Sequence, residues 1–208
     1  YTLDALRHQG FTTDELTDAG LVRLNERGQI VDRFRDRLAM PVRDGHGRLV
    51  GFTARKNPGD DGPAPKYRNA SSTALFAKAE LLSGRTPEAI QRLNDGATPV
   101  LGEGALDAEA IASLGQDWVG LATCGTALTP SHLAPLEAVA PGSVNRIVTA
   151  FDPDAAGRKA TARTWELLPD AAPHHVRSAL LPHGCDPAKL IEDGDGALLA
   201  ASLGAAAP

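Results

Sequence analysis

The second half of the 208-residue chain alternates four times between a short apolar run and a helical stretch. The apolar runs cover residues 99–102, 118–122, 146–151 and 175–180. The helical stretches cover residues 106–114, 130–138, 156–168 and 187–191. Strands that alternate with helices pair in parallel, because each helix returns the chain to the same end of the sheet. Residues 97–208 are therefore predicted to form an α/β domain with a mostly parallel, Rossmann-like sheet.

Residues 1–96 follow a different pattern. Leucines at helical spacing predict short amphipathic helices over residues 3–24, with a helix start at residues 12–15. Short strands are predicted at residues 30–31, 37–42 and 49–52. The turn sequence DGHG at residues 44–47 predicts that the strands at residues 37–42 and 49–52 form a hairpin. We therefore expect a small α+β subdomain ahead of the α/β domain.

Charge is distributed unevenly between the two halves. Residues 1–100 contain 15 Lys and Arg against 13 Asp and Glu, whereas residues 101–208 contain 6 against 13. A basic part beside an acidic part suits a protein that holds polyanions on one side and cations on the other. Solvated surface charge produces the same imbalance, so composition leaves both interpretations open.

Cysteine content and hydropathy exclude several classes of protein. Cys124 and Cys185 are too few for a disulfide framework or a four-ligand zinc site. No apolar run reaches the roughly 18 residues of a membrane span, and the N-terminus lacks the pattern of a signal peptide. We expect no zinc site in this chain, no membrane contact and a reducing, cytoplasmic location.

Acidic residues follow three of the four predicted strands. Glu103 lies between two glycines after the first strand, Asp152 and Asp154 follow the third, and Asp186 follows the fourth. Asp107 lies one helical turn beyond Glu103. Because the carboxyl ends of parallel strands meet at one edge, these carboxylates are expected to converge there. They would repel one another unless a hard cation such as Mg²⁺ or Mn²⁺ lay between them.

Each carboxylate also has a purely structural interpretation. Asp154 is placed to cap a helix, and Asp186 precedes a proline as in an ordinary Asp-Pro turn. Glu103 fits a solvated loop residue equally well. Taken singly, each residue is better explained by these structural roles; it is their common position at strand ends that favours a metal site.

Several motifs resemble one known family. Residues 103–107, 124–129 and 151–160 read EGALD, CGTALT and FDPDAAGRKA. They resemble the Toprim core of bacterial-type (DnaG-like) DNA primases. The resemblance extends upstream through DRFRDRLAMPVRD at residues 32–44, GRLVGFTAR at 47–55, PKYRNAS at 65–71 and FAK at 76–78. It covers about residues 3–195.

The resemblance implies an RNA polymerase core in which a small basic α+β subdomain, residues 1–96, precedes a Toprim subdomain, residues 97–208. Such a core synthesises short RNA primers on single-stranded DNA by metal-dependent nucleotidyl transfer. The implied catalytic residues are Glu103, Asp152 and Asp154. The implied Mg²⁺ or Mn²⁺ ligands are the same three with Asp107 and Asp186. The implied contacts to nucleotides or nucleic acid are Arg55, Lys66, Asn69 and Lys78.

The arginines of residues 33–37 are weaker functional candidates than Lys66 and Lys78. Arg33, Arg35 and Arg37 alternate, so they can form one charged strand face paired with neighbouring aspartates. The structural interpretation is therefore preferred for these arginines.

The implied partners are a single-stranded DNA template, nucleoside triphosphates and an RNA primer, with a replicative or conjugative helicase contacting regions outside this chain. The family's zinc module and helicase-binding domain are missing here. Asp186 is followed by Pro187-Ala188, where the family has a second acid two residues on. The chain is therefore expected to be a domain of a larger protein, carried by a plasmid or other mobile element.

Two other functions stay open. A non-catalytic nucleic-acid-binding Toprim module is consistent with the missing second acid after Asp186. A metal-dependent Toprim nuclease would share Glu103, Asp152 and Asp154 but would not need the basic segment at residues 66–78. A topoisomerase would need a nucleophilic tyrosine on a separate domain. It is disfavoured, because the only tyrosines are Tyr1 and Tyr67, and Tyr67 lies inside the basic motif.

Overall fold

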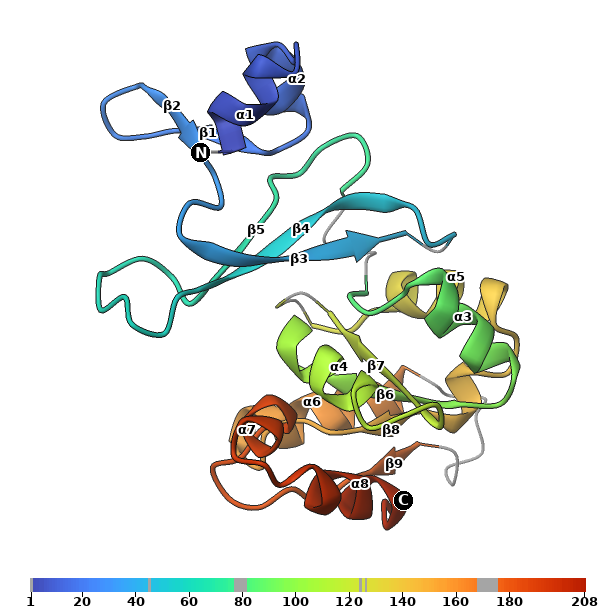
Figure 1. Ribbon diagram of the computed structural model, residues 1–208. Helices are drawn as coiled ribbons and strands as arrows, with labels where there is room; N and C mark the ends of the chain where they lie inside the picture. The colour runs from blue at the N-terminus through green and yellow to red at the C-terminus, as the bar shows by residue number, and fades with distance from the viewer. Residues whose placement is uncertain (1, 45, 77–81, 124, 126, 168–175) are drawn as a thin grey trace. The chain divides into compact units, whose positions relative to one another are not determined.

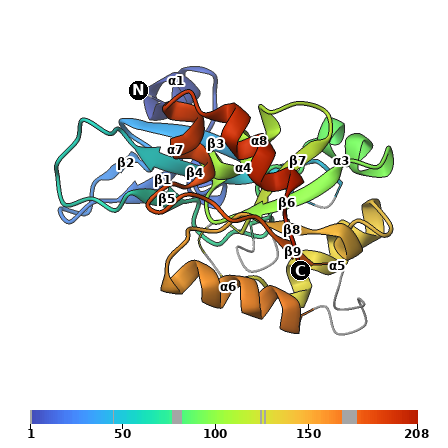
Figure 2. The same cartoon turned by 90° about the horizontal axis from the view of Figure 1, so that it is seen from below.

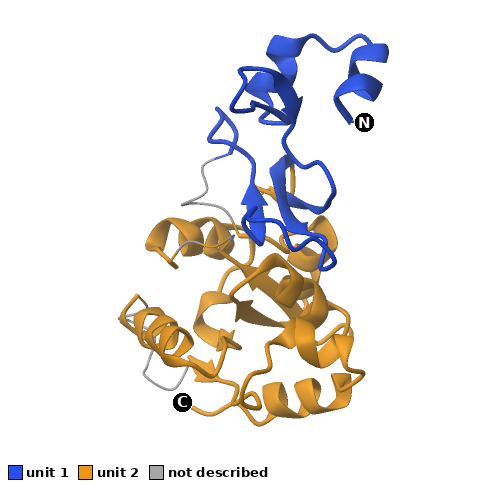
Figure 3. Ribbon diagram, turned by 90° about the vertical axis from the view of Figure 1, so that its left-hand side faces the viewer, with its two compact units in different colours: residues 1–42, 49–77 blue, residues 43–48, 78–208 orange. Residues whose placement is uncertain are grey.

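The structure is a computed structural model that describes residues 2–44, 46–76, 82–123, 125, 127–167 and 176–208 (Figure 1). The chain divides into two compact units (Figure 3). Unit 1 comprises residues 1–42 and 49–77, and unit 2 comprises residues 43–48 and 78–208. The contacts thus group residues 82–96 with the second unit, and the domain boundary between residues 96 and 97 stays a prediction.

Unit 1 begins with two short helices, α1 (Thr2–His8) and α2 (Thr13–Asp18). Thr12 caps α2: its side chain accepts a hydrogen bond from the Glu15 amide at 3.2 Å, and the Glu15 carboxylate accepts one from the Thr12 amide at 2.7 Å. This confirms the helix start predicted at residues 12–15.

The helical expectation for residues 3–24 is wrong at its end. Gly20 has a φ of +69°, which terminates helical structure, and the chain continues as strand β1 (Val22–Leu24). β1 pairs antiparallel with β2 (Ile30–Asp32). Three residues are too few to show strand alternation in the sequence.

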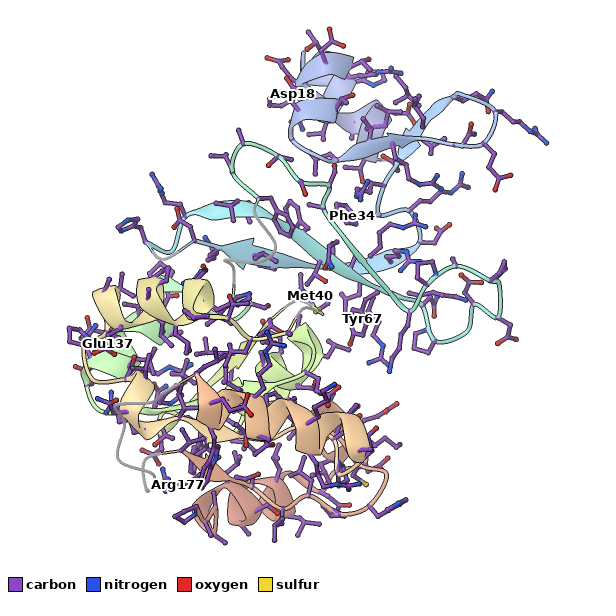
Figure 4. All side chains as sticks on the ribbon, turned by 180° about the vertical axis from the view of Figure 1, so that it is seen from behind. Asp18, Phe34, Met40, Tyr67, Glu137 and Arg177 are labelled. Atoms are coloured by element: carbon purple, nitrogen blue, oxygen red, sulfur yellow. The ribbon has the colours of Figure 1, made fainter. Side chains whose placement is uncertain are left out.

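A three-stranded sheet forms the rest of unit 1. Its strands are β3 (Arg37–Arg43), β4 (Leu49–Lys56) and β5 (Tyr67–Asn69), in the order β3-β4-β5. The turn between β3 and β4 lies at the predicted hairpin position. β5 pairs antiparallel with β4, with Arg55 opposite Tyr67 and Thr53 opposite Asn69. Phe34, labelled in Figure 4, lies edge-on to Phe52 of β4 with ring centroids 6.1 Å apart.

Unit 2 contains the parallel sheet that the sequence predicts. Its strands are β6 (Thr98–Gly102), β7 (Trp118–Ala122), β8 (Val148–Thr149) and β9 (Arg177–Ser178). They lie in the order β7-β6-β8-β9, and every neighbouring pair is parallel. Leu101 is opposite Thr149, and Gly102 is opposite Ala122, so the carboxyl ends of β6, β7 and β8 are aligned.

Helices cover both faces of this sheet, and Figure 2 shows α6 on the opposite side from α7 and α8. The helices of unit 2 are α3 (Pro87–Asn94), α4 (Ala105–Ala112), α5 (Pro130–Val139), α6 (Ala155–Glu166), α7 (Pro187–Glu192) and α8 (Gly196–Gly204), with a 3₁₀ turn, η2 (Val144–Arg146).

The alternating side chains of the strands supply two separate hydrophobic cores. Leu101 packs in a core with Leu93 of α3 and Leu136 of α5. Its neighbour Val100 packs in the other core with Ile111 of α4. In the described part of the chain no helix is both long and apolar enough to cross a bilayer.

Candidate active site

The strand-end carboxylates meet at the carboxyl edge of the parallel sheet, as predicted. Glu103 directly follows β6, and Asp152 and Asp154 follow β8. A carboxylate oxygen of Glu103 accepts a hydrogen bond from the backbone amide of Asp152 at 3.2 Å, across 49 residues of sequence. Partial burial, and then the negative charges of Asp152, Asp154 and Asp186, raise the pKa of Glu103 above its usual range. The four acids therefore lie close enough to repel one another.

Asp107, on the first turn of α4, is held by two backbone amides. It is only 6% exposed. Its Oδ2 accepts from the Gly104 amide at 2.8 Å, and its Oδ1 accepts from the Ala188 amide at 3.3 Å. Burial first, and then repulsion from Asp186 and Asp152, outweighs these hydrogen bonds and raises the pKa of Asp107 to about 6. Asp107 thus joins the start of α4 to the start of α7, which Asp186 caps.

Asp154 and Asp186 both cap helices. This confirms the capping role considered for Asp154, whereas Asp186 is a helix cap and not only the Asp-Pro turn that the sequence suggested. Asp154 Oδ1 accepts from the Gly157 amide at 2.8 Å at the start of α6. Asp186 Oδ1 accepts from the Lys189 amide at 2.5 Å at the start of α7. Among the described residues, neither Oδ2 has a hydrogen-bond partner. One oxygen fixes each side chain, and the other stays available to a ligand.

Gly157 allows α6 to begin close beneath Asp152. A Cβ at this position would lie 2.0 Å from the Asp152 carbonyl oxygen. The Asp154 amide donates to the same carbonyl at 2.8 Å. The loop carrying both aspartates is therefore fixed by backbone contacts to its own helix.

The donor chemistry of this edge fits a hard divalent cation. The acidic side chains at this edge all present carboxylate oxygens, which are the ligands that hard divalent cations prefer. A bound cation would also relieve the repulsion among their negative charges. Across the described ranges, however, no three such side chains lie close enough to enclose an ion. The fit therefore rests on the type of donor and on the repulsion among Glu103, Asp107, Asp152, Asp154 and Asp186.

The predicted basic contacts lie in unit 1, apart from Lys78, which is outside the described residues. Arg55 is near the end of β4, Lys66 precedes β5, and Asn69 ends it. The Lys66 ammonium lies 6.0 Å from the Tyr67 ring centroid. Within the described ranges, neither Arg55 nor Lys66 has a carboxylate partner. Cations without an internal counter-ion are available to an external anion.

Sequence reasoning missed a cavity of about 300 Å³ in unit 2. Its lining includes Glu103, Thr123, Leu128, Phe151 and Arg163. Glu103 directly follows β6 and Thr123 directly follows β7, so the cavity adjoins the acidic edge. The family-like motif at residues 124–129 was the available signal for it.

Comparison with known protein families agrees with this geometry. Residues 1–87 match the family described as "DNA primase catalytic core, N-terminal domain", and residues 100–191 match the family described as "Toprim-like". The chain belongs to the DnaG-type DNA primase catalytic-core family. The fold predicted from the sequence, a mixed α/β chain with a Toprim sheet, is confirmed for this primase-family chain.

Relatives and solved structures extend the likeness over nearly the whole chain. The DNA primase of Deinococcus radiodurans is 40% identical over 196 residues, which are 94% of this chain and 33% of that protein. The RNA polymerase domain of Mycobacterium tuberculosis primase DnaG is 31% identical with a TM-score of 0.81, covering 99% of this chain and 66% of that one.

A second structure, of a DnaG primase catalytic domain bound to single-stranded DNA, is 30% identical with a TM-score of 0.76 and covers 98% of this chain and 62% of that one. This primase-family chain thus spans about a third of the length of the full primases it matches.

Proposed function

We propose that the chain is the catalytic core of a DNA primase, which synthesises short RNA primers on single-stranded DNA by metal-dependent nucleotidyl transfer. The observation that carries the proposal is the convergence of Glu103, Asp152, Asp154 and Asp186 at one sheet edge, in a chain of this family. Its substrates would be nucleoside triphosphates and an RNA primer paired to the template.

The acids divide into ligands and supports. Asp152 and Asp154, with Asp186, would hold Mg²⁺ or Mn²⁺, and Asp107 supports them by fixing the start of α7. When bound, the ion supplies positive charge that favours attack of a 3′-hydroxyl on an α-phosphate and departure of pyrophosphate. Glu103, whose pKa is raised, accepts the hydroxyl proton more readily than an ordinary carboxylate or completes the ligand set.

The basic residues predicted from the sequence would contact the polyanions. Arg55 and Lys66 of unit 1, together with Lys78, would supply positive charge for triphosphate, template or primer, and Asn69 adds an amide that can both donate and accept. Contacts of this kind to phosphates are tolerant of sequence and sensitive to salt. Binding of single-stranded DNA by a structural relative supports this assignment.

Nucleotide joining on single-stranded DNA tests the proposal. The assay supplies labelled nucleoside triphosphates, Mn²⁺ and a short RNA primer, and compares the parent with Glu103→Gln. Glu109→Gln is the matched control, because Glu109 is an exposed acid on the adjacent helix α4. We expect the parent and Glu109→Gln to extend the primer, and Glu103→Gln to lose about 10²-fold or more of the rate.

The alternatives give different results in the same assay. Binding of DNA without any extension would indicate a non-catalytic Toprim module, and degradation of the template would indicate a nuclease. A helicase partner, a plasmid or mobile-element origin and a cytoplasmic location stay predictions.

A further inference from the structure

Two arginines hold both ends of the Lys66–Asn69 stretch: Arg33 precedes β3, and Arg37 is its first residue. Arg37 Nη2 donates to the Pro65 carbonyl at 2.8 Å, and its Nη1 lies 3.4 Å from the Lys66 carbonyl oxygen. Arg33 Nε donates to the Asn69 carbonyl at 2.7 Å. The two guanidinium groups therefore bond to main chain, not to the aspartates that the sequence suggested as partners.

The stretch that these arginines hold is otherwise a short edge strand with the turn before it. β5 is a three-residue edge strand whose sheet neighbour is β4. At its ends the Lys56 amide donates to the Lys66 carbonyl, and the Ala70 amide donates to the Phe52 carbonyl, both at 2.8 Å. Short edge strands fray readily, because few hydrogen bonds fix them. The arginines add three contacts to these two backbone bonds at the ends of the strand.

Bringing the arginines together has an electrostatic cost. Burial first, and then the charge of Arg23, lowers the pKa of Arg33. Burial, followed by Arg37, Arg23 and Arg33, lowers the pKa of Arg68. Arg68 Nη1 in turn donates to the Arg33 carbonyl at 3.1 Å. Among the described residues no carboxylate pairs with Arg33 or Arg37. Charge neutralisation therefore does not explain the cluster, whereas holding the backbone does.

We propose that Arg33 and Arg37 are positioning residues, which fix the backbone of residues 65–69 so that Lys66 and Asn69 meet nucleotide phosphates or template in one geometry. The inference rests on the proposed primase function for the role of Lys66 and Asn69. The contacts of Arg33 and Arg37 with the carbonyls of residues 65, 66 and 69, here called the arginine clamp, exist independently of that function. Lysine cannot replace Arg37, because a single ammonium group lacks the planar fork that reaches both the Pro65 and the Lys66 carbonyl. It cannot replace Arg33 either, because lysine has no N–H at the Nε position from which Arg33 donates to Asn69.

The test compares Arg33→Lys and Arg37→Lys with Arg35→Lys. Arg35 belongs to the same segment and has the same charge, but its side chain is 57% exposed and bonds to the adjacent Asp36. All three variants keep the net charge. Amide hydrogen exchange over residues 66–70 measures the clamp directly, and steady-state primer extension gives KM for nucleoside triphosphate and kcat separately.

We expect Arg33→Lys and Arg37→Lys to accelerate exchange over residues 66–70 about tenfold, with parental exchange elsewhere and in Arg35→Lys. Arg37→Lys should raise KM about tenfold with kcat nearly unchanged, because a displaced side chain loses binding geometry. Added to Lys66→Ala, it should raise KM little further, since the two residues act as a unit.

Parental exchange over residues 66–70 in both variants would overturn the clamp. Faster exchange with an unchanged KM would overturn the positioning role and leave only a structural one. If the parent itself extends no primer, the proposed function fails, and the exchange measurement still decides whether the clamp exists.

Discussion

The acidic edge of unit 2 and the basic stretch of unit 1 are held in different ways. Asp154 and Asp186 are fixed by amides three residues further along the chain, at the starts of their own helices. Lys66 and Asn69 are fixed through their carbonyls by arginines 29 and 36 residues earlier. Local capping fixes the side chains of Asp154 and Asp186, whereas the basic stretch depends on tertiary contacts. The two regions should therefore respond differently to substitution.

Asp154→Asn separates the chemical role of the acidic edge from its structural role. Asparagine caps a helix about as well as aspartate, so α6 should persist. Loss of the charge should lower the rate of nucleotide joining by about 10²–10³-fold. Primer extension and thermal unfolding measure the two effects, with Asp195→Asn at the start of α8 as control. Activity equal to the parent's would remove Asp154 from the metal site.

The raised pKa of Asp107 predicts that the stability of the folded chain depends on pH. Its pKa is about 6 in the folded chain against an ordinary value of 3.8, so folding favours the neutral acid. This contribution is fully present below about pH 4 and is lost as pH rises through 6, with a magnitude on the order of 3 kcal/mol. The control variant is Asp117→Asn, because Asp117 is an exposed acid directly before β7. Urea unfolding in EDTA should show the decline in the parent and in Asp117→Asn, and a flatter profile in Asp107→Asn. Equal slopes in all three proteins would show that Asp107 titrates normally.

Gly157→Ala tests whether backbone contacts hold the aspartate loop. The new Cβ would lie 2.0 Å from the Asp152 carbonyl oxygen, so the loop or the first turn of α6 must move. We expect a loss of about 1–3 kcal/mol in unfolding free energy, together with reduced primer extension. Gly204→Ala is the matched control, since a Cβ there meets nothing within 4 Å. A fully active and stable Gly157→Ala variant would contradict this account of the loop.

Features that depend on local contacts could be predicted from the sequence, and features that depend on tertiary contacts could not. The parallel sheet and the positions of Glu103, Asp152, Asp154 and Asp186 were predictable, because strand ends and helix caps depend on neighbouring residues. The bond from the Ala188 amide to Asp107 was not, since it joins residues 81 apart.

The role of Arg33 and Arg37 was missed for a related reason. Alternating arginines in a sequence indicate a charged strand face, and nothing in the sequence shows that their guanidinium groups reach carbonyls about 30 residues away. Tertiary hydrogen bonds from side chains to distant backbone leave no periodic pattern.

Lys66→Ala gives the smallest expected effect and tests the basic stretch alone. Removing one phosphate contact should weaken nucleotide and template binding by about tenfold and reduce the slope of log affinity against log salt by about one. Lys189→Ala is the control, because Lys189 is paired with Asp193 at 2.5 Å and lies in unit 2. If affinity falls while the salt slope is unchanged, Lys66 acts by shaping the stretch and not by its charge. In that case the arginine clamp and Lys66 would have the same function, and the contrast between a locally held acidic edge and a clamped basic stretch would become sharper.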